Sequence, residues 1–315
     1  MITSTDIAAA RDRIADRVRR TPVMALDRGE LPGPGWLKLE LLQHTGSFKA
    51  RGAFNRILQA RETGELDPGV GVVAASGGNA GLAHAFAAAQ LGVPATVFVP
   101  TTAPKVKVDR LRLLGAEVVA TGTEYAAAYE AALQRAERSG AVFCHAYDQP
   151  AIVAGAGTLG LELLDQVVGG FDTVVVAVGG GGLMAGVAAS LEGIARVVGV
   201  EPVAVPTLSA ALSAGEPVDV AVSGVAADSL GARRVGEIAY EAAIRTGVRS
   251  VLVGDDDLVA ARRLLWDQRR IVVEHGAAAA LAALTSGAYV PEQGERVVVV
   301  LCGANTDPGD LVRVP

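Results

Sequence analysis

Lys49 stands in surroundings that are unusual for a lysine. It follows the run TGSF, residues 45–48, and it opens the stretch KARGAFNRIL, which is typical of a helix. A cation in the first turn of a helix opposes the helix dipole, and a lysine that is buried there has a lowered pKa. An isolated lysine is most often a solvated surface side chain. Whether Lys49 does chemistry therefore depends on what the fold places beside it.

A second feature is the run of four glycines, Gly179 to Gly182, which directly follows the apolar run VVVAV. A tight turn needs only one or two glycines, and each further glycine costs conformational entropy. Four in succession indicate a nest of backbone N–H groups that can surround a phosphate. The sequence therefore predicts a phosphate site at this loop.

Two more loops follow apolar runs. SGGNAG, residues 76–81, places a hydroxyl, two glycines and an amide where a helix begins, and free N–H groups there attract anions. A helix cap with glycine turns would give the same pattern. Cys302 follows the run RVVVVL, and taken alone it is most simply a small buried residue.

One further glycine pattern could indicate a different ligand, a dinucleotide. GAGTLG, residues 155–160, matches the dinucleotide-binding pattern G-x-G-x-x-G, which should follow a buried strand. Here it follows YDQPAIVA, which contains a proline and is typical of a loop and a helix start. We therefore do not assign a dinucleotide site to it.

Apolar runs rich in valine alternate with alanine-rich helical stretches along most of the chain. Continuous valine runs indicate strands that are buried on both faces, and strand–helix–strand order implies parallel sheets flanked by helices. The predicted fold class is α/β with two lobes, each built on a mostly parallel sheet. We expect a large domain formed by residues 1–66 and 145–315, and a small domain formed by residues 67–144. Ligands of such sheets bind at the carboxyl ends of the strands, where the loops above lie.

Composition narrows the possible functions. The 315 residues carry a formal net charge of −6, which gives no basic footprint for nucleic acid. Cys144 and Cys302 are too few for a disulfide framework. The charged N-terminus lacks a signal-peptide core, and the most apolar window is broken by glycines and too short to span a membrane. We expect a soluble cytoplasmic protein without a nucleic-acid or membrane partner.

A lysine, a glycine cradle, an anion loop and a polar residue at a strand end together suit pyridoxal phosphate, which needs an amine, a phosphate site and partners for its ring. The sequence resembles the fold-type II pyridoxal-phosphate enzymes, specifically the serine/threonine dehydratases. The similar segments occur in order along nearly the whole chain: TGSFKARGA, ASGGNAG, VGGGGL, GVEP, SLGARRVGEI, EHGAAAALAAL and LCGAN.

The resemblance implies a role for each motif. Lys49 would hold the cofactor covalently and act as the base at Cα, and Glu274 is a weaker candidate for the same neighbourhood. The residues expected to bind the cofactor are Phe48, Lys49, Asn79, Gly179, Gly180, Gly181, Gly182, Leu183, Gly231 and Cys302. Those expected to bind the substrate are Ser76, Gly77, Gly78 and Asn79.

The implied reaction is elimination of water from L-threonine or L-serine, through an aminocrotonate or aminoacrylate, to 2-oxobutanoate or pyruvate and ammonia. The resemblance also implies a homodimer. Two departures from relatives bear on this. Serine racemases of the family carry a serine where this chain has Gly77, so racemisation is disfavoured. Some relatives bind Mg²⁺ near GVEP, but Thr207 stands where a second carboxylate is needed beside Glu201, so we predict no metal.

Three alternatives stay open at this point. One is a racemase or β-replacement synthase with the same cofactor, and another is a lyase for a related β-hydroxy or diamino acid. The third is a binding module without catalytic activity, against which the intact Lys49 and the intact glycine run argue.

Overall fold

The valine runs form the strands of two separate sheets. The computed structural model of the chain describes residues 1–312. The larger sheet has six strands in the order β1-β2-β10-β7-β8-β9, and the smaller has four in the order β5-β4-β3-β6. All neighbours are parallel except β1 and β2. The predicted α/β class, with two helix-flanked and mostly parallel sheets, is confirmed.

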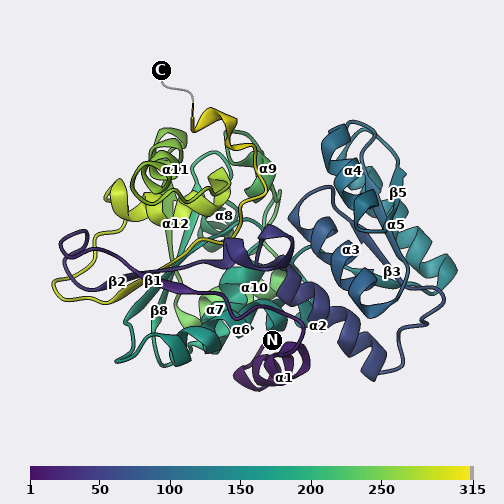
Figure 1. The fold of residues 1–315 in the computed structure, drawn as a ribbon, viewed down its shortest axis with the longest axis horizontal. Coiled ribbons are helices and arrows are strands. Elements are labelled where there is room, and N and C mark those ends of the chain that lie inside the picture. Colours follow the sequence, from purple (N-terminus) through teal and green to yellow (C-terminus); the bar gives the residue numbers. More distant parts are fainter. Residues whose placement is uncertain (313–315) are drawn as a thin grey trace.

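The strands of the larger sheet are β1 (Val23–Ala25), β2 (Gly35–Lys38), β7 (Thr173–Ala177), β8 (Arg196–Pro202), β9 (Arg249–Val253) and β10 (Val297–Val300). The helices that follow or precede them are α1 (Ser4–Ile14), α6 (Pro150–Gln166), α7 (Gly182–Ser190), α8 (Thr207–Ala214), α9 (Ala227–Leu230), α10 (Glu237–Thr246), α11 (Asp255–Arg269) and α12 (His275–Thr285). Helix α12 packs on one face of this sheet, and α7, backed by α6 and α10, packs on the other (Figure 1).

The smaller sheet contains β3 (Val72–Ala75), β4 (Ala95–Val99), β5 (Glu117–Ala120) and β6 (Val142–Cys144). Its helices are α3 (Asn79–Leu91), α4 (Lys105–Leu113) and α5 (Tyr125–Ser139), and α5 packs on the face opposite α3. Helix α2 (Lys49–Glu62) lies between the two groups and contacts both α3 and α6 (Figure 1). Short 3-10 turns occupy Glu40–Leu42, His44–Gly46 and Pro308–Asp310. The domain boundaries proposed from the sequence stay a prediction.

Burial explains the strand sequences. Every residue of β3, β7 and β10 is buried, as expected for strands covered on both faces. By contrast, β5 at the edge of the smaller sheet is partly exposed. Apolar side chains from the larger sheet, with those of the helices that cover it, form one continuous core.

The GAGTLG segment serves helix packing. It lies inside α6, and a Cβ added to Gly155 would come within 2.6 Å of the Arg51 carbonyl oxygen of α2. One added to Gly157 would come within 2.7 Å of the Gly186 carbonyl oxygen of α7. The glycines let three helices approach closely, which agrees with the absence of a dinucleotide assignment from the sequence.

Candidate active site

The predicted site residues come together around one cavity of about 1170 Å³. The residues that line it include every one proposed from the sequence, namely Phe48, Lys49, Ser76, Gly77, Gly78, Asn79, Gly179, Gly180, Gly181, Gly182, Leu183, Gly231, Glu274 and Cys302. Most of them lie at the carboxyl ends of β3, β7 and β10 and at the start of α2, while Gly231 follows α9 and Glu274 precedes α12. The roles suggested for them stay predictions.

Lys49 is placed by a constrained loop. Thr45 and Gly46 have positive φ values of 60° and 77°, and the Thr45 carbonyl accepts a hydrogen bond of 2.7 Å from the Asn305 side chain. A threonine rarely adopts such a backbone conformation, and strained residues of this kind cluster at functional sites. The Phe48 N–H donates to the Cys302 carbonyl at 3.1 Å, which joins the lysine loop to the end of β10.

The amine of Lys49 faces the cavity with one protein partner. Its Nζ donates to the carbonyl oxygen of Ala146 at 2.6 Å. Burial lowers the pKa of Lys49 to about 8, while the nearby Glu274 acts in the opposite direction. A neutral amine is the form that can attack a carbonyl carbon or accept a proton, and this environment makes it accessible near neutral pH.

The four glycines form a cradle, and a side chain at Gly180, Gly181 or Gly182 would collide with neighbouring atoms. A Cβ on Gly180 would lie 2.4 Å from the ring of Tyr147, and one on Gly182 would lie 2.7 Å from the Tyr147 carbonyl oxygen. Gly181 has a φ of 85° and immediately precedes α7, which has no side-chain cap. The free N–H groups of the first turn of α7 therefore open onto the cavity, as a phosphate group requires.

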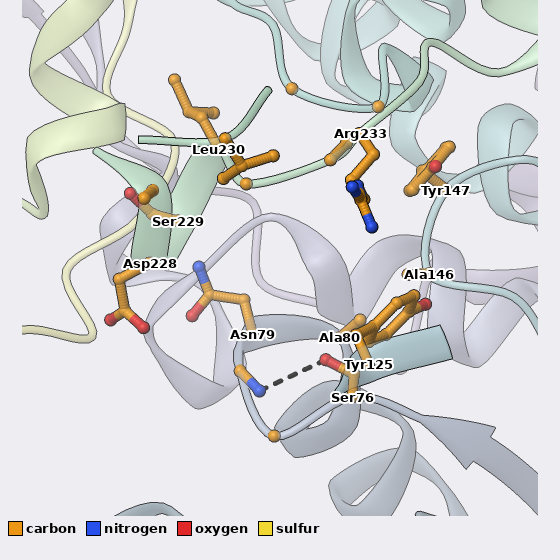
Figure 2. A pocket seen from close by; sticks show the side chains of 18 of the residues that line it. Ser76, Asn79, Ala80, Tyr125, Ala146, Tyr147, Asp228, Ser229, Leu230 and Arg233 are labelled. Carbon is orange, nitrogen blue, oxygen red and sulfur yellow. Dashed lines mark hydrogen bonds between the residues drawn. The ribbon is translucent and has the colours of Figure 1, made fainter. Parts of the chain in front are cut away.

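The SGGNAG loop of the smaller sheet is joined by hydrogen bonds to residues of the larger-sheet group. The Ser76 hydroxyl accepts a hydrogen bond from the Gly78 N–H at 3.2 Å (Figure 2). Asn79 donates to Glu274 at 2.8 Å and accepts from Asn305 at 2.7 Å, so its amide is fixed in orientation. One N–H of that amide is left for a ligand, since a side-chain amide carries two donors.

Two buried groups near Lys49 have raised pKa values. Burial raises the pKa of Glu274 to about 7, although the hydrogen bond from Asn79 acts against this. Burial also raises the pKa of Cys302, so its thiol stays neutral. A neutral thiol can exchange a hydrogen bond with a ring nitrogen, but it cannot hold that nitrogen protonated as a carboxylate would.

Comparison with known proteins agrees with this geometry. Residues 14–303 match the family model "Pyridoxal-phosphate dependent enzyme". The chain belongs to this family. The cradle, the half-buried amine and the fixed amide fit pyridoxal phosphate, because they supply a phosphate site, a nucleophile and a polar partner.

Three proteins show how similar the family members are. The L-threonine ammonia-lyase of Thermotoga maritima is 35% identical over 323 aligned positions, which cover 100% of this chain and 78% of that protein. The phenylserine dehydratase of Ralstonia pickettii is 39% identical, with 98% and 94% covered. The structure of maize serine racemase has a TM-score of 0.91 at 28% identity, covering 98% of this chain and 95% of that one.

Sequence reasoning missed part of the cavity. Tyr125, Tyr129, Tyr147 and Arg233 also line it. The first two begin the helix after β5, and Tyr147 follows β6, so the same strand-end rule that selected the glycine loop could have found them. Glu201 is used structurally: its carboxylate accepts hydrogen bonds from Thr207, Leu208 and Ser209 at the start of α8.

Proposed function

We propose that this enzyme eliminates water from L-threonine, L-serine or both, and releases ammonia with 2-oxobutanoate or pyruvate. The observation that carries the proposal is the Lys49 amine, held by the Ala146 carbonyl at 2.6 Å inside a cavity that also contains the glycine cradle. The relatives named as an ammonia-lyase and a dehydratase, each similar over nearly the whole chain, support the same reaction class.

Each group of residues in the cavity would have its own role. Gly179 to Gly182 and the first turn of α7 would hold the phosphate of pyridoxal phosphate, and Asn79 would orient its ring. When bound, this cofactor acts as an electron sink that acidifies the Cα–H bond of an amino acid. Ser76 and the N–H groups beside it would hold the substrate carboxylate. The Nζ of Lys49 would take the Cα proton, for which a pKa of about 8 is well matched.

The net reaction balances without an oxidant. The Cα–H and Cβ–O bonds of threonine break and a water molecule leaves. The resulting enamine rearranges to an imine, which one water molecule hydrolyses to 2-oxobutanoate and ammonia. Serine gives pyruvate by the same route.

Gly77 distinguishes this reaction from the closest alternative, a serine racemase. Racemisation requires a proton donor on the face of Cα opposite the lysine, and Gly77 has no side chain to supply one. A lyase for another β-hydroxy or diamino acid would use the same residues and differ only in the group that leaves. We also propose, on the family resemblance alone, that the enzyme is a cytoplasmic homodimer.

A lysine substitution tests the proposal. Lys49→Ala should reduce release of 2-oxo acid from threonine and serine to background, whereas Lys105→Ala, which removes an exposed lysine of α4, should leave it unchanged. Borohydride treatment of the wild-type holoenzyme should attach the cofactor to the peptide that contains Lys49. Turnover by Lys49→Ala, or D-serine formed without pyruvate, would contradict the proposed function.

A further inference from the structure

An unassigned row of aromatic rings crosses the cavity wall. Tyr125 and Tyr129 lie one turn apart at the start of α5, and their ring centroids are 6.0 Å apart. The ring of Tyr129 lies 5.6 Å from that of His145, and His145 lies 4.7 Å from Tyr147, both nearly edge to face. We call these four residues the aromatic wall. Tyr125, Tyr129 and Tyr147 line the same cavity as Lys49.

The inner end of the aromatic wall lies at the reactive amine. Ala146, whose carbonyl oxygen accepts the hydrogen bond from Lys49, stands between His145 and Tyr147 in the chain. The ring of Tyr147 also lies directly against Gly180 of the cradle. The position of this end of the wall is therefore fixed relative to both the amine and the expected phosphate site.

The outer end of the wall is uncovered. Tyr125 is 47% exposed. The buried residues of α5 are all alanines, so Tyr125 is not part of the packing of this helix on its sheet. Small side chains contribute to the same cavity lining and leave space in front of the rings. They include Ala80, Ala103, Ala126 and Ala146. Figure 2 shows Tyr125 beside Ala80 and Ser76, on the side of the cavity opposite Arg233.

The cavity is larger than the simplest substrates need. Its volume of about 1170 Å³ has to hold the cofactor as well as the substrate, and sites for a single small molecule typically occupy roughly 300–1,000 Å³. The β-substituent of serine is a hydroxymethyl group, and threonine adds only one methyl. Substituents of this size do not need Tyr125 and Tyr129, the rings at the end of the wall away from the amine.

Resting on the proposed elimination, we infer that the aromatic wall binds an aromatic group on Cβ of the substrate, and that β-aryl-β-hydroxy-α-amino acids are the preferred substrates. Aromatic rings favour offset or edge-to-face partners at the spacings found in this wall. For phenylserine, the Cα–H and Cβ–O bonds break and water leaves. The enamine becomes an imine, which water hydrolyses to phenylpyruvate and ammonia.

Arg233 marks a competing possibility. Its side chain is exposed, lines the cavity and faces Tyr125 across it (Figure 2). A guanidinium in this place could bind a carboxylate on Cβ, as in 3-hydroxyaspartate. Two other cations of the lining, Lys107 and Arg234, pair with Asp228 and Asp219. The aromatic group is favoured because three rings and four alanines of the lining suit an apolar group, whereas a carboxylate on Cβ would depend on Arg233.

The test compares turnover of L-threo-phenylserine, L-threonine and L-threo-3-hydroxyaspartate by the holoenzyme. We expect kcat/KM for phenylserine to exceed that for threonine at least tenfold. Tyr125→Ala and Tyr129→Ala should each lower this ratio tenfold or more. Tyr125→Phe and Tyr129→Phe keep the rings and should preserve it. A ratio below one, a ratio unaffected by the alanine variants, or 3-hydroxyaspartate as the best substrate with loss in Arg233→Ala would overturn the inference.

A binding measurement separates this inference from the proposed reaction. L-Phenylalanine has the ring but no β-hydroxyl group, so it can bind without elimination. By calorimetry on the holoenzyme it should bind at least tenfold more tightly than L-alanine, and the tyrosine-to-alanine variants should lose that preference. Equal binding of the two amino acids would overturn the role of the wall. Tight phenylalanine binding with no turnover of any β-hydroxy amino acid would support the wall and contradict the elimination.

Discussion

The pKa of Lys49 is set by opposing effects. Burial disfavours the ammonium form, while the Glu274 carboxylate favours it, and burial prevails. Glu274 is itself shifted upward, so its own charge appears only as the pH rises through about 7. The two groups change charge within the same pH range, which makes the site sensitive to pH on a scale that an exposed lysine would not show.

The lowered pKa of Lys49 predicts how cofactor incorporation depends on pH. Only the neutral amine can form a covalent bond to an aldehyde, and the neutral fraction of Lys49 rises as the pH increases through about 8. Covalent incorporation into the cofactor-free enzyme should therefore rise between pH 7 and pH 9 and then level off. Borohydride trapping followed by mass spectrometry measures it. Glu274→Gln, which removes a nearby negative charge, should move the midpoint to lower pH. A midpoint near that of an ordinary lysine would contradict the assignment.

At the scale of elements, α2 is anchored by buried charges. The Arg51 guanidinium donates to both oxygens of Glu40, at 2.8 and 2.7 Å, and to Glu162 of α6 at 2.7 Å. Lys38 of β2 donates to Glu162 at 2.6 Å. Arg51 lies two residues after Lys49, so this network joins the first turn of the lysine helix to the larger sheet.

Substitution of Glu40 should destabilise the fold. Removing one partner of a buried ion pair leaves an uncompensated charge, which costs about 3–5 kcal/mol. Glu40→Gln should lower the free energy of unfolding by about that amount, measured by urea denaturation. Burial acts to raise the pKa of Glu40, but the charges and hydrogen bonds of its partners, Arg51 foremost, hold it below its usual value. The stability that Glu40 contributes is therefore present at neutral pH and lost as the pH falls through that lowered pKa. Glu62→Gln, in a half-exposed pair with Arg13, should change stability by less than about 1 kcal/mol.

Periodicity and strand-end loops were enough to predict the two-sheet class and to select residues that the structure brings to one cavity. They missed strands with a weak apolar pattern, and they missed charged residues whose burial depends on contacts between distant parts of the chain. β1 and β2, which form an antiparallel pair, were not anticipated because they have only three and four residues. β9 was not anticipated because it begins with the polar Arg249 and Ser250. The charges of Lys38, Glu40 and Arg51 look like surface residues in the sequence. Only tertiary contacts show that they are buried together.

At the scale of the whole molecule, the cavity depends on how the two sheets face each other. Asn79 and Glu274 join loops of the two sheets inside the cavity, at 2.8 Å. Lys107 of α4 pairs with Asp228 of α9 across it, nearer to solvent. Polar contacts therefore join the two sheets at the cavity, and the ion pair is the more exposed of them. No helix among residues 1–312 is long and apolar enough to cross a membrane.

The ion pair between Lys107 and Asp228 should affect substrate retention more than chemistry. Its side chains are 29% and 67% exposed, and such pairs contribute at most about 1 kcal/mol, roughly a fivefold change in an equilibrium constant. Asp228→Asn should therefore raise KM by up to about fivefold and leave kcat within about twofold, because Lys49 and its partners are untouched. Raising the salt concentration should raise the wild-type KM in the same direction, since salt screens exposed charges.

Asp219→Asn is the matched control for this prediction. Asp219 pairs with Arg234, their side chains are 70% and 51% exposed, and both residues line the cavity. Unlike Lys107 and Asp228, they belong to one segment of the chain, between α8 and α10 of the larger-sheet group. Loss of that pair removes a comparable charge without removing a connection between the two sheets, so its KM should stay within about twofold of wild type. If the two variants raised KM equally, the effect would come from the charge of the cavity and not from the connection. If neither variant nor added salt changed KM, the ion pair would have no part in retaining the substrate, and the polar connection between the two sheets would rest on the contacts of Asn79 with Glu274 and Asn305.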